Sequence, residues 1–287
     1  MTISKTIMAL GLNALLLASC GGDNGHDNTN ELADSTVVAA KDTTAYTVSD
    51  TTKFKFDFAI ANIPSPANTL QDLAQWGIAY DPSILNDSKK SAHYTTEFQR
   101  SINLGVYNID MAYAMVNDKG ADVLQYMKNI MMLSDALGLK GAMNAMVGKR
   151  AQENINNKDS LFGILDEIFV KSDIYLRTNE RVYTAGIIFA GSWLESLYIA
   201  SKLGGQLSDA NLKVVANRHL WEQRMHLGNL INLLGDYKDK KECAALIADL
   251  KPIDDAVSKF SKPTDMSDAD FKEITAKIID LRNKLTK

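Results

Sequence analysis

The amino-acid sequence predicts an all-α fold, a single bundle of about eight or nine helices. Apolar residues recur every three or four positions over most of the stretch 66–285, which is the period of an amphipathic helix. Glycine and proline separate these segments, and strand-type alternation is confined to one short stretch near residues 54–60. We expect one folded domain over residues 54–287, a span long enough to bury a sizeable core.

The segment 1–19 has the layout of a secretory signal peptide. Lys5 is its one charged side chain, and the run from Thr6 to Ser19 carries no charge. That run is too short to cross a bilayer as a helix, which takes about 20 residues. The prediction is therefore a cleaved signal over residues 1–19 rather than a membrane span.

This segment ends in the motif LASC, residues 17–20, which resembles the lipobox of bacterial lipoproteins. The resemblance implies that cleavage occurs before Cys20 and that Cys20 carries acyl chains such as palmitate, with the membrane as its partner. Each buried CH₂ group contributes about 0.8 kcal/mol, and two or more chains hold a protein stably at a bilayer. The alternative is an ordinary secretory signal whose cleavage site happens to end in cysteine.

Residues 20–53 are expected to form the lipidated cysteine and a disordered linker. They are rich in Asn, Thr, Ser, Gly and Asp, and cannot bury enough apolar surface to offset the entropy of ordering. As a flexible coil this linker reaches about 30 Å in root-mean-square terms. Such a spacer would hold the folded domain clear of the lipid headgroups.

Each element of the folded domain has local start and stop signals. Alternating apolar residues predict a short extended segment over 54–60, which the IPSP motif at 63–66 ends. Candidate N-caps are Ser65, Ser208 and Ser267, and the candidate stops are Gly77, Gly138, Gly204, Gly205 and Pro263. The expected helices are 66–76, 92–117, 120–137, 142–155, 159–178, 180–203, 208–235, 239–260 and 267–285, with a break in 239–260 near Pro252.

Two expected helices look central. Segment 180–203 is apolar on most sides of its axis, as a buried helix should be, and Gly186, Ala190 and Gly191 would let a neighbouring helix approach closely. Its uncharged run over 182–194 is shorter than a membrane span and suits a core helix. Segment 92–117 carries two apolar stripes, which suggests contacts on two sides.

The charge and cysteine content exclude several classes of protein. Removal of residues 1–19 leaves 30 basic and 35 acidic side chains, a net charge of −5, so no nucleic-acid partner is expected. With Cys20 lipidated, Cys243 has no partner for a disulfide. We expect Cys243 to be a small buried residue in a helix rather than a reactive thiol.

Asp110 is the first polar residue that looks misplaced, because it lies between the two apolar stripes of its helix. Tyr107 and Tyr113 flank it at three positions on either side. A carboxylate there needs hydrogen-bond partners or a raised pKa. It is either a ligand-contacting acid lined by tyrosines or a structural Asp held by tyrosine hydroxyls or by an Arg from another helix.

Glu195 ends the uncharged run of segment 180–203. It could point into a cleft, with Trp193 nearby as a further candidate ligand-binding residue. The alternative is a Glu at the margin of a buried helix that pairs with a Lys or an Arg.

The motif HLWEQRMH, residues 219–226, is the one cluster of metal-type side chains. His219, Glu222 and His226 share one side of a helix, but the histidines are about 10.5 Å apart along the axis, so one ion cannot bind both. A zinc site would need ligands from a second helix. We predict no metal and no cofactor, and the alternative to a site is a Glu–His hydrogen-bonded face.

The stretches IPSP (63–66), LGVYNIDMAYA (104–114) and GSWLESLY (191–198) resemble a group of uncharacterised, all-helical lipoproteins of Bacteroidota. The resemblance extends over most of residues 54–240. It implies an exported, lipid-anchored helical domain in the cell envelope, at the outer membrane and facing either the periplasm or the cell surface. It implies no activity, cofactor or catalytic residue.

The sequence leaves three functions open. The favoured one is a non-enzymatic lipoprotein whose helical domain binds an envelope protein or a small molecule, with no catalytic residues. The candidate ligand-binding residues are Tyr107, Asp110, Tyr113, Trp193, Glu195, His219, Glu222 and His226. The alternatives are a hydrolase or metal-dependent enzyme that uses Asp110, Glu195, His219, Glu222 and His226, and a purely structural partner in an envelope complex.

Overall fold

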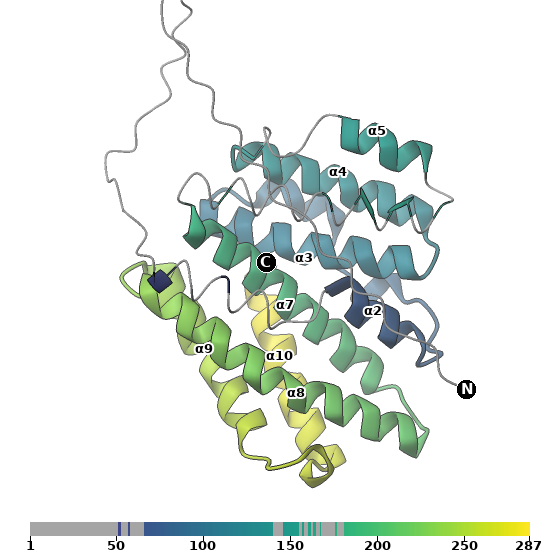
Figure 1. Cartoon of the computed structure of the whole chain (residues 1–287), viewed down its shortest axis with the longest axis vertical. Helices are drawn as coiled ribbons and strands as arrows, with labels where there is room; N and C mark the ends of the chain where they lie inside the picture. The colour runs from purple at the N-terminus through teal and green to yellow at the C-terminus, as the bar shows by residue number, and fades with distance from the viewer. Residues whose placement is uncertain are drawn as a thin grey trace, which may run out of the picture. The chain divides into compact units, whose positions relative to one another are not determined.

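The computed structural model describes residues 51–52, 57, 66–139, 146–154, 157, 160–161, 163–164, 167, 176 and 181–287 (Figure 1). This part of the chain contains eight α-helices and no strand, so the expected all-α fold is confirmed. The α-helices are α2 (Pro66–Ala74), α3 (Glu97–Val116), α4 (Gly120–Ala136), α5 (Met146–Glu153), α7 (Val182–Gly204), α8 (Ala210–Leu234), α9 (Lys241–Ser258) and α10 (Asp268–Leu285). Short 3₁₀ helices are η1 (Pro82–Ile84), η2 (Ser88–His93), η3 (Gly235–Tyr237) and η4 (Pro263–Asp265).

Helices α3 and α7 form the centre of the domain and cross with their backbones in contact. A Cβ atom at Gly105 would lie 2.6 Å from the backbone nitrogen of Ser192, and one at Gly191 would lie 2.9 Å from the carbonyl carbon of Ile102. The hydroxyl of Ser192 also donates to the carbonyl of Gly105 at 3.2 Å. Only glycine fits at these two positions, because any side chain would meet the backbone of the other helix.

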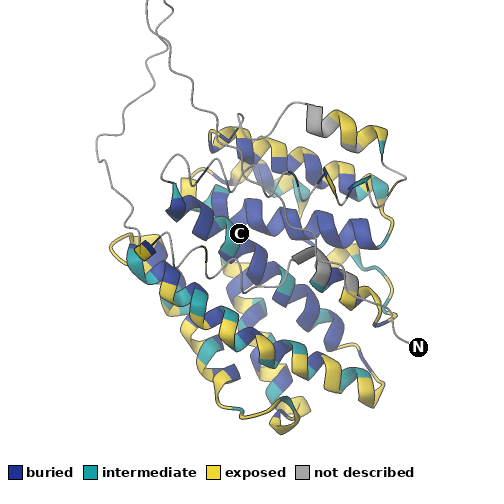
Figure 2. Ribbon diagram, viewed as in Figure 1, coloured by how far each residue is buried: buried dark blue, intermediate teal, exposed yellow. Residues whose placement is uncertain are grey.

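The remaining helices surround this pair. Helices α2 and α4 pack on α3, while α8 and α10 pack on α7, and α9 completes the domain against α8 and α10. Every residue of α3 from Ser101 to Val116 is buried, and Figure 2 shows the ribbon of this helix dark blue along most of its length. The two segments that the sequence predicts to be central are therefore central.

Helix α7 is long and apolar enough to span a membrane, but 83% of its most apolar window is buried inside the protein. Such a helix serves as the core of the domain, as expected from its residues. A Cβ atom added at Gly186 would lie 3.7 Å from Cδ2 of Leu233 in α8, which is an ordinary contact distance, so of these two glycines it is Gly191 that makes the expected close approach.

Three expected element boundaries are wrong. The helix expected from residue 92 begins at Glu97, and residues 88–93 form η2 before it. Asp209 rather than Ser208 caps α8, because its side chain accepts from two backbone N–H groups. Helix α9 continues through Pro252 without the expected break. Pro252 and Ala248, whose carbonyl loses its intrahelical donor, are both exposed, so water can satisfy that carbonyl.

Other boundaries agree with the sequence. Ser267 caps α10 in a capping box with Asp270, α2 begins at Pro66, and Gly77 and Gly138 adopt positive φ angles of 71° and 72° after α2 and α4. The expected thiol environment is also confirmed, since Cys243 is buried in α9 and burial raises its pKa to about 11.

Several expectations fall outside the described residues. These are the signal peptide, Cys20, the linker up to residue 50, most of the extended segment 54–60, Ser65 and most of the helix 159–178. Where residues near the linker boundary are described, they differ from the expectation: Thr51, Thr52 and Asp57 are helical. Thr52 is buried, and its hydroxyl donates to Asp236 at 2.6 Å, so the folded domain includes the end of the expected linker.

Candidate functional site

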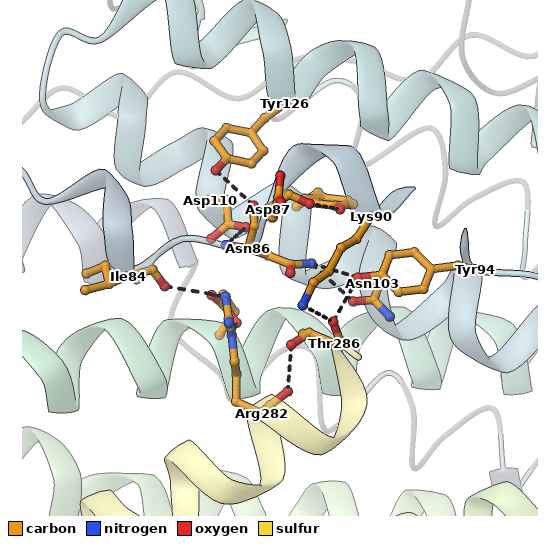
Figure 3. Close-up of polar contacts among 12 residues, drawn as sticks. Ile84, Asn86, Asp87, Lys90, Tyr94, Asn103, Asp110, Tyr126, Arg282 and Thr286 are labelled. Carbon is orange, nitrogen blue, oxygen red and sulfur yellow. Dashed lines mark hydrogen bonds and ion pairs between the residues drawn. The ribbon is translucent and has the colours of Figure 1, made fainter. Parts of the chain in front are cut away.

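The middle of α3 places the carboxyl group of Asp110 in the core. The side chain is fully buried, and its Oδ2 accepts a hydrogen bond of 3.1 Å from the backbone N–H of Asn86. Asn86 lies between η1 and η2, so the segment before α3 folds back over that helix to reach the acid (Figure 3).

Glu195 of α7 is equally buried and pairs with Arg282 in the last turn of α10. Nε and Nη2 of Arg282 each donate to a different oxygen of Glu195 at 2.9 Å. This bidentate geometry is the strongest that a guanidinium makes with a carboxylate. The guanidinium carbon also lies 4.6 Å from the ring centroid of Tyr198, and Nη2 reaches the carbonyl of Ile84 at 3.4 Å. The expected pairing of Glu195 with an Arg is thus found, in the core rather than at its margin.

The two carboxyl groups and Arg282 form one electrostatic unit. Burial raises the pKa of Asp110 well above its ordinary value of 3.8, and the negative charge of Glu195 and a hydrogen bond to it raise it further. Arg282 and the N–H of Asn86 oppose this shift less strongly. Oδ1 of Asp110 has no N–H or O–H partner among the described residues, so it is the oxygen that can carry a proton. With that proton on Asp110 the unit holds one positive and one negative charge, which a dry core tolerates best.

Asn86 connects this unit to the surrounding helices. Its Nδ2 donates to the hydroxyl of Tyr94 at 3.1 Å and to Oδ1 of Asn103 at 3.4 Å, and its carbonyl accepts from the hydroxyl of Tyr126 at 3.1 Å. The side chain of Asn86 therefore fixes the segment before α3 to α3, and its backbone carbonyl fixes the same segment to α4 (Figure 3).

The same network holds the end of α10. Lys90 and Tyr94 donate to the carbonyl of Thr286 at 2.9 and 3.4 Å, and Asn103 donates to the carbonyl of Leu285 at 3.0 Å. The last carbonyls of a helix have no partner within it, so these donors replace the missing intrahelical bonds. Arg282 is thereby held in place for its contact with Glu195.

The aromatic candidates are bonded within the fold. Tyr107 donates to the carbonyl of Asp87 at 2.9 Å, and burial raises its pKa, so the hydroxyl remains a donor. The hydroxyl of Tyr113 accepts from the N–H of Asp81 at 3.5 Å. Trp193 donates to Oε1 of Gln223 at 3.0 Å. Tyr107 and Tyr113 thus hold the segment before α3, and Trp193 joins α7 to α8.

The histidine face of α8 lies apart from this network. His219 and His226 are half-buried, and burial lowers the pKa of each, so both are neutral near pH 7. His219 meets the ring of Trp76 edge-on, with centroids 6.4 Å apart. Glu222 is exposed, and no hydrogen bond joins it to either histidine within the described chain, so the expected Glu–His face is not formed. The described residues include no group of three or more His, Cys, Asp or Glu side chains that could hold a metal ion.

Asn86 and Arg282, two residues at the centre of the network, are not among the site residues predicted from the sequence. Asn86 lies in a segment with no periodic pattern, and nothing in its neighbourhood distinguishes it from a surface loop residue. Arg282 did carry a signal, because it falls within the apolar stripe formed by Phe271, Ile278 and Leu285 at helical spacing. A charged residue on the buried stripe of a helix indicates a buried partner.

The chain matches no family model, no curated protein and no solved structure. Asp110 and Glu195 are fully buried, and they are hydrogen-bonded to the backbone N–H of Asn86 and to Arg282. An arrangement of this kind holds helices together and fixes the ionisation of a buried acid.

Proposed function

We propose that this chain is an envelope lipoprotein whose helical domain binds or assembles with another envelope component and catalyses no reaction. Acyl chains on Cys20 tether the domain to the membrane, and the residues after Cys20 act as a spacer. The support for the tether is the LASC motif, which ends the charge-free run that begins at Thr6. The domain faces the periplasm or the cell surface.

The burial of Asp110 and Glu195 is the observation that favours a binding or assembly role over catalysis. A catalytic acid or base has to come within hydrogen-bond distance of the substrate. Both side chains are fully buried, and the bidentate pair with Arg282 occupies both oxygens of Glu195. These residues support the packing of α3, α7 and α10, and they leave the surface of the domain to make the functional contacts.

The competing proposal is a hydrolase or metal-dependent enzyme. Its best support is that Asp110, a buried acid of raised pKa, lies beside the carboxylate of Glu195 that pairs with Arg282, because two neighbouring carboxyl groups in different environments are a common catalytic arrangement. The histidines of α8 would have to join this pair, but within the described residues no group of three or more His, Cys, Asp or Glu side chains forms a possible metal site. The non-enzymatic proposal does not require the buried carboxyl groups and the histidines of α8 to come together.

Replacement of the two cysteines tests the tether. In bacteria that express the full chain and are fed an alkyne analogue of palmitate, we expect the wild type to be labelled and to sediment with membranes. Cys20→Ser should lose both properties because it has no thiol to acylate. Cys243→Ser is the matched control, since that thiol is buried and should not affect labelling. Label on Cys20→Ser, or a wild-type chain of unmodified mass, would overturn the proposal.

A further inference from the structure

A pocket of ≈310 Å³ lies between the end of α7, the first turns of α8 and the part of α10 from Asp268 to Ile279. Its volume falls at the lower end of the range of small-molecule sites, about 300–1,000 Å³. None of the eight candidate residues from the sequence lines it. Its lining includes Leu207, Ala216, Phe271 and Ile279, together with Lys213 and Lys272.

The walls of the pocket are fixed by contacts within the protein. A Cβ atom at Gly204 would lie 2.8 Å from Cζ of Phe271, so the glycine lets this ring pack against the end of α7. Nδ2 of Asn217 donates to the carbonyl of Met266 at 3.0 Å and holds the approach to α10. These contacts preform the hollow, which reduces the ordering cost of binding.

The inner wall is apolar and contains one polar group without a partner. Phe271, Leu207, Ala216 and Ile279 supply the apolar surface. The hydroxyl of Thr275 is buried and makes no hydrogen bond with a described residue. That oxygen is closed to solvent, so the contacts that the pocket offers a ligand come from its apolar side chains and its charged rim.

The mouth of the pocket carries an excess of positive charge. Lys213 of α8 pairs with Asp268 of α10 at 2.9 Å across the rim, and Lys272 adds a second, exposed ammonium one turn further along α10. Lys272 forms no ion pair with any residue in the described ranges, although its charge also acts on Asp268, so two lysines and one aspartate leave one net positive charge at the mouth. In a chain of net charge −4, this local excess favours a negatively charged ligand.

We propose that this pocket binds a small amphipathic carboxylate, a molecule with one carboxylate and a hydrocarbon body. The hydrocarbon packs against Phe271 and Ile279, and the carboxylate lies at the mouth near Lys272 and Lys213. The inference gives the proposed binding role a ligand class. It does not depend on the anchor at Cys20, so the two can fail separately.

Calorimetric titration of the purified full-length chain with decanoate tests the ligand class. Decanol has the same hydrocarbon body without charge, and decyltrimethylammonium has it with the opposite charge. We expect decanoate to bind at least about tenfold more tightly than either analogue, the factor that corresponds to 1.4 kcal/mol. Equal binding of decanol, or no saturable binding of decanoate, would overturn the proposal.

Substitutions in the pocket test the location. Ala276→Phe should fill the hollow and abolish decanoate binding, whereas Ala245→Phe, on the exposed face of α9, should leave it unchanged. Lys272→Glu should weaken binding by about tenfold, with Lys251→Glu on α9 as the charge-matched control. Ala276 and Lys272 are both exposed, so we expect their substitution to leave the fold intact. Circular dichroism of all four variants verifies this. Decanoate binding that survives Ala276→Phe in a folded variant would contradict the assignment.

Discussion

Asp110 shows how a single ionisable residue can be accommodated in a dry core. Its Oδ2 accepts from a backbone N–H, and its pKa is raised by burial and by Glu195, so the acid is most stable with a proton on Oδ1. The charge of Arg282 then balances that of Glu195 alone. Removal of either member of that pair would leave an unpaired buried charge, which is far more costly than loss of the whole pair.

Asparagine at position 110 mimics the protonated acid, because its amide can donate toward Glu195 and accept from Asn86. We expect Asp110→Asn to keep the unfolding free energy at pH 7 within about 1 kcal/mol of wild type or to raise it. Asp110→Ala should lower that free energy by about 1–3 kcal/mol, since the N–H of Asn86 and the carboxylate of Glu195 both lose a partner. Urea unfolding monitored by fluorescence measures both values.

The unfolding free energies of the wild type and of Asp110→Asn should depend differently on pH. A raised folded-state pKa means that the folded chain binds more protons than the unfolded chain above pH 3.8. The wild type therefore loses stability relative to Asp110→Asn as the pH rises from 3.8 through the folded pKa of Asp110, by at most about 1.4 kcal/mol per pH unit. Parallel stability curves for the two proteins would contradict a protonated Asp110.

The residue-scale site could be predicted only in part. Asp110 and Glu195 stand out because each interrupts an apolar pattern, and that local signal marks a buried polar group that needs a partner. The partners do not follow from the pattern: Asn86 is 24 residues from Asp110, and Arg282 is 87 residues from Glu195. Tertiary packing decides which helices meet and at which residues, and the local sequence pattern contains no information about that pairing.

At the scale of elements, the crossing of α3 and α7 depends on two glycines. Gly105 and Gly191 let each backbone touch the other helix, and this close approach places Asp110 and Glu195 in one unit. The sequence identified Gly191 as a residue for close approach. The contact with Ile102 became visible only in the structure.

A methyl group at this crossing should separate the two helices. We expect Gly191→Ala to lower the unfolding free energy by at least about 1–3 kcal/mol, because the added carbon meets the backbone of Ile102 rather than a movable side chain. Gly228→Ala in α8 is the control, since a Cβ there meets nothing within 4 Å and alanine favours a helix by about 1 kcal/mol. Thermal unfolding compares the two variants, and equal melting temperatures would argue against the tight crossing.

The boundaries of the elements were predictable where a side chain acts on its own backbone. Ser267 caps α10 and Gly138 follows α4 in the left-handed conformation, and both features are local in the sequence. Pro252 misled the prediction because the cost of a proline depends on whether water reaches the freed carbonyl. That exposure is a tertiary property, and in α9 it permits the helix to continue.

At the scale of the whole molecule, α3 and α7 form a core that the other described helices cover. Amide hydrogen exchange should reflect this arrangement. We expect the amides of α3 and α7 to exchange only by global unfolding, and those of α5 to exchange soonest among the described helices, because most of its described side chains are exposed. Mass spectrometry of peptides after exchange measures this order. Faster exchange in α3 than in α5 would contradict a core built on that helix.

The sequence by itself determined the all-α class, the approximate span of each described helix and the identity of the two buried ones. These follow from the 3.6-residue period and from caps and glycines that act over a few residues. The tertiary structure alone decided that Asp110, Glu195, Asn86 and Arg282 meet in one buried unit, and that a pocket opens between α7, α8 and α10. Such contacts depend on how helices distant in the chain cross, which is set by the shapes of packed faces rather than by any local pattern.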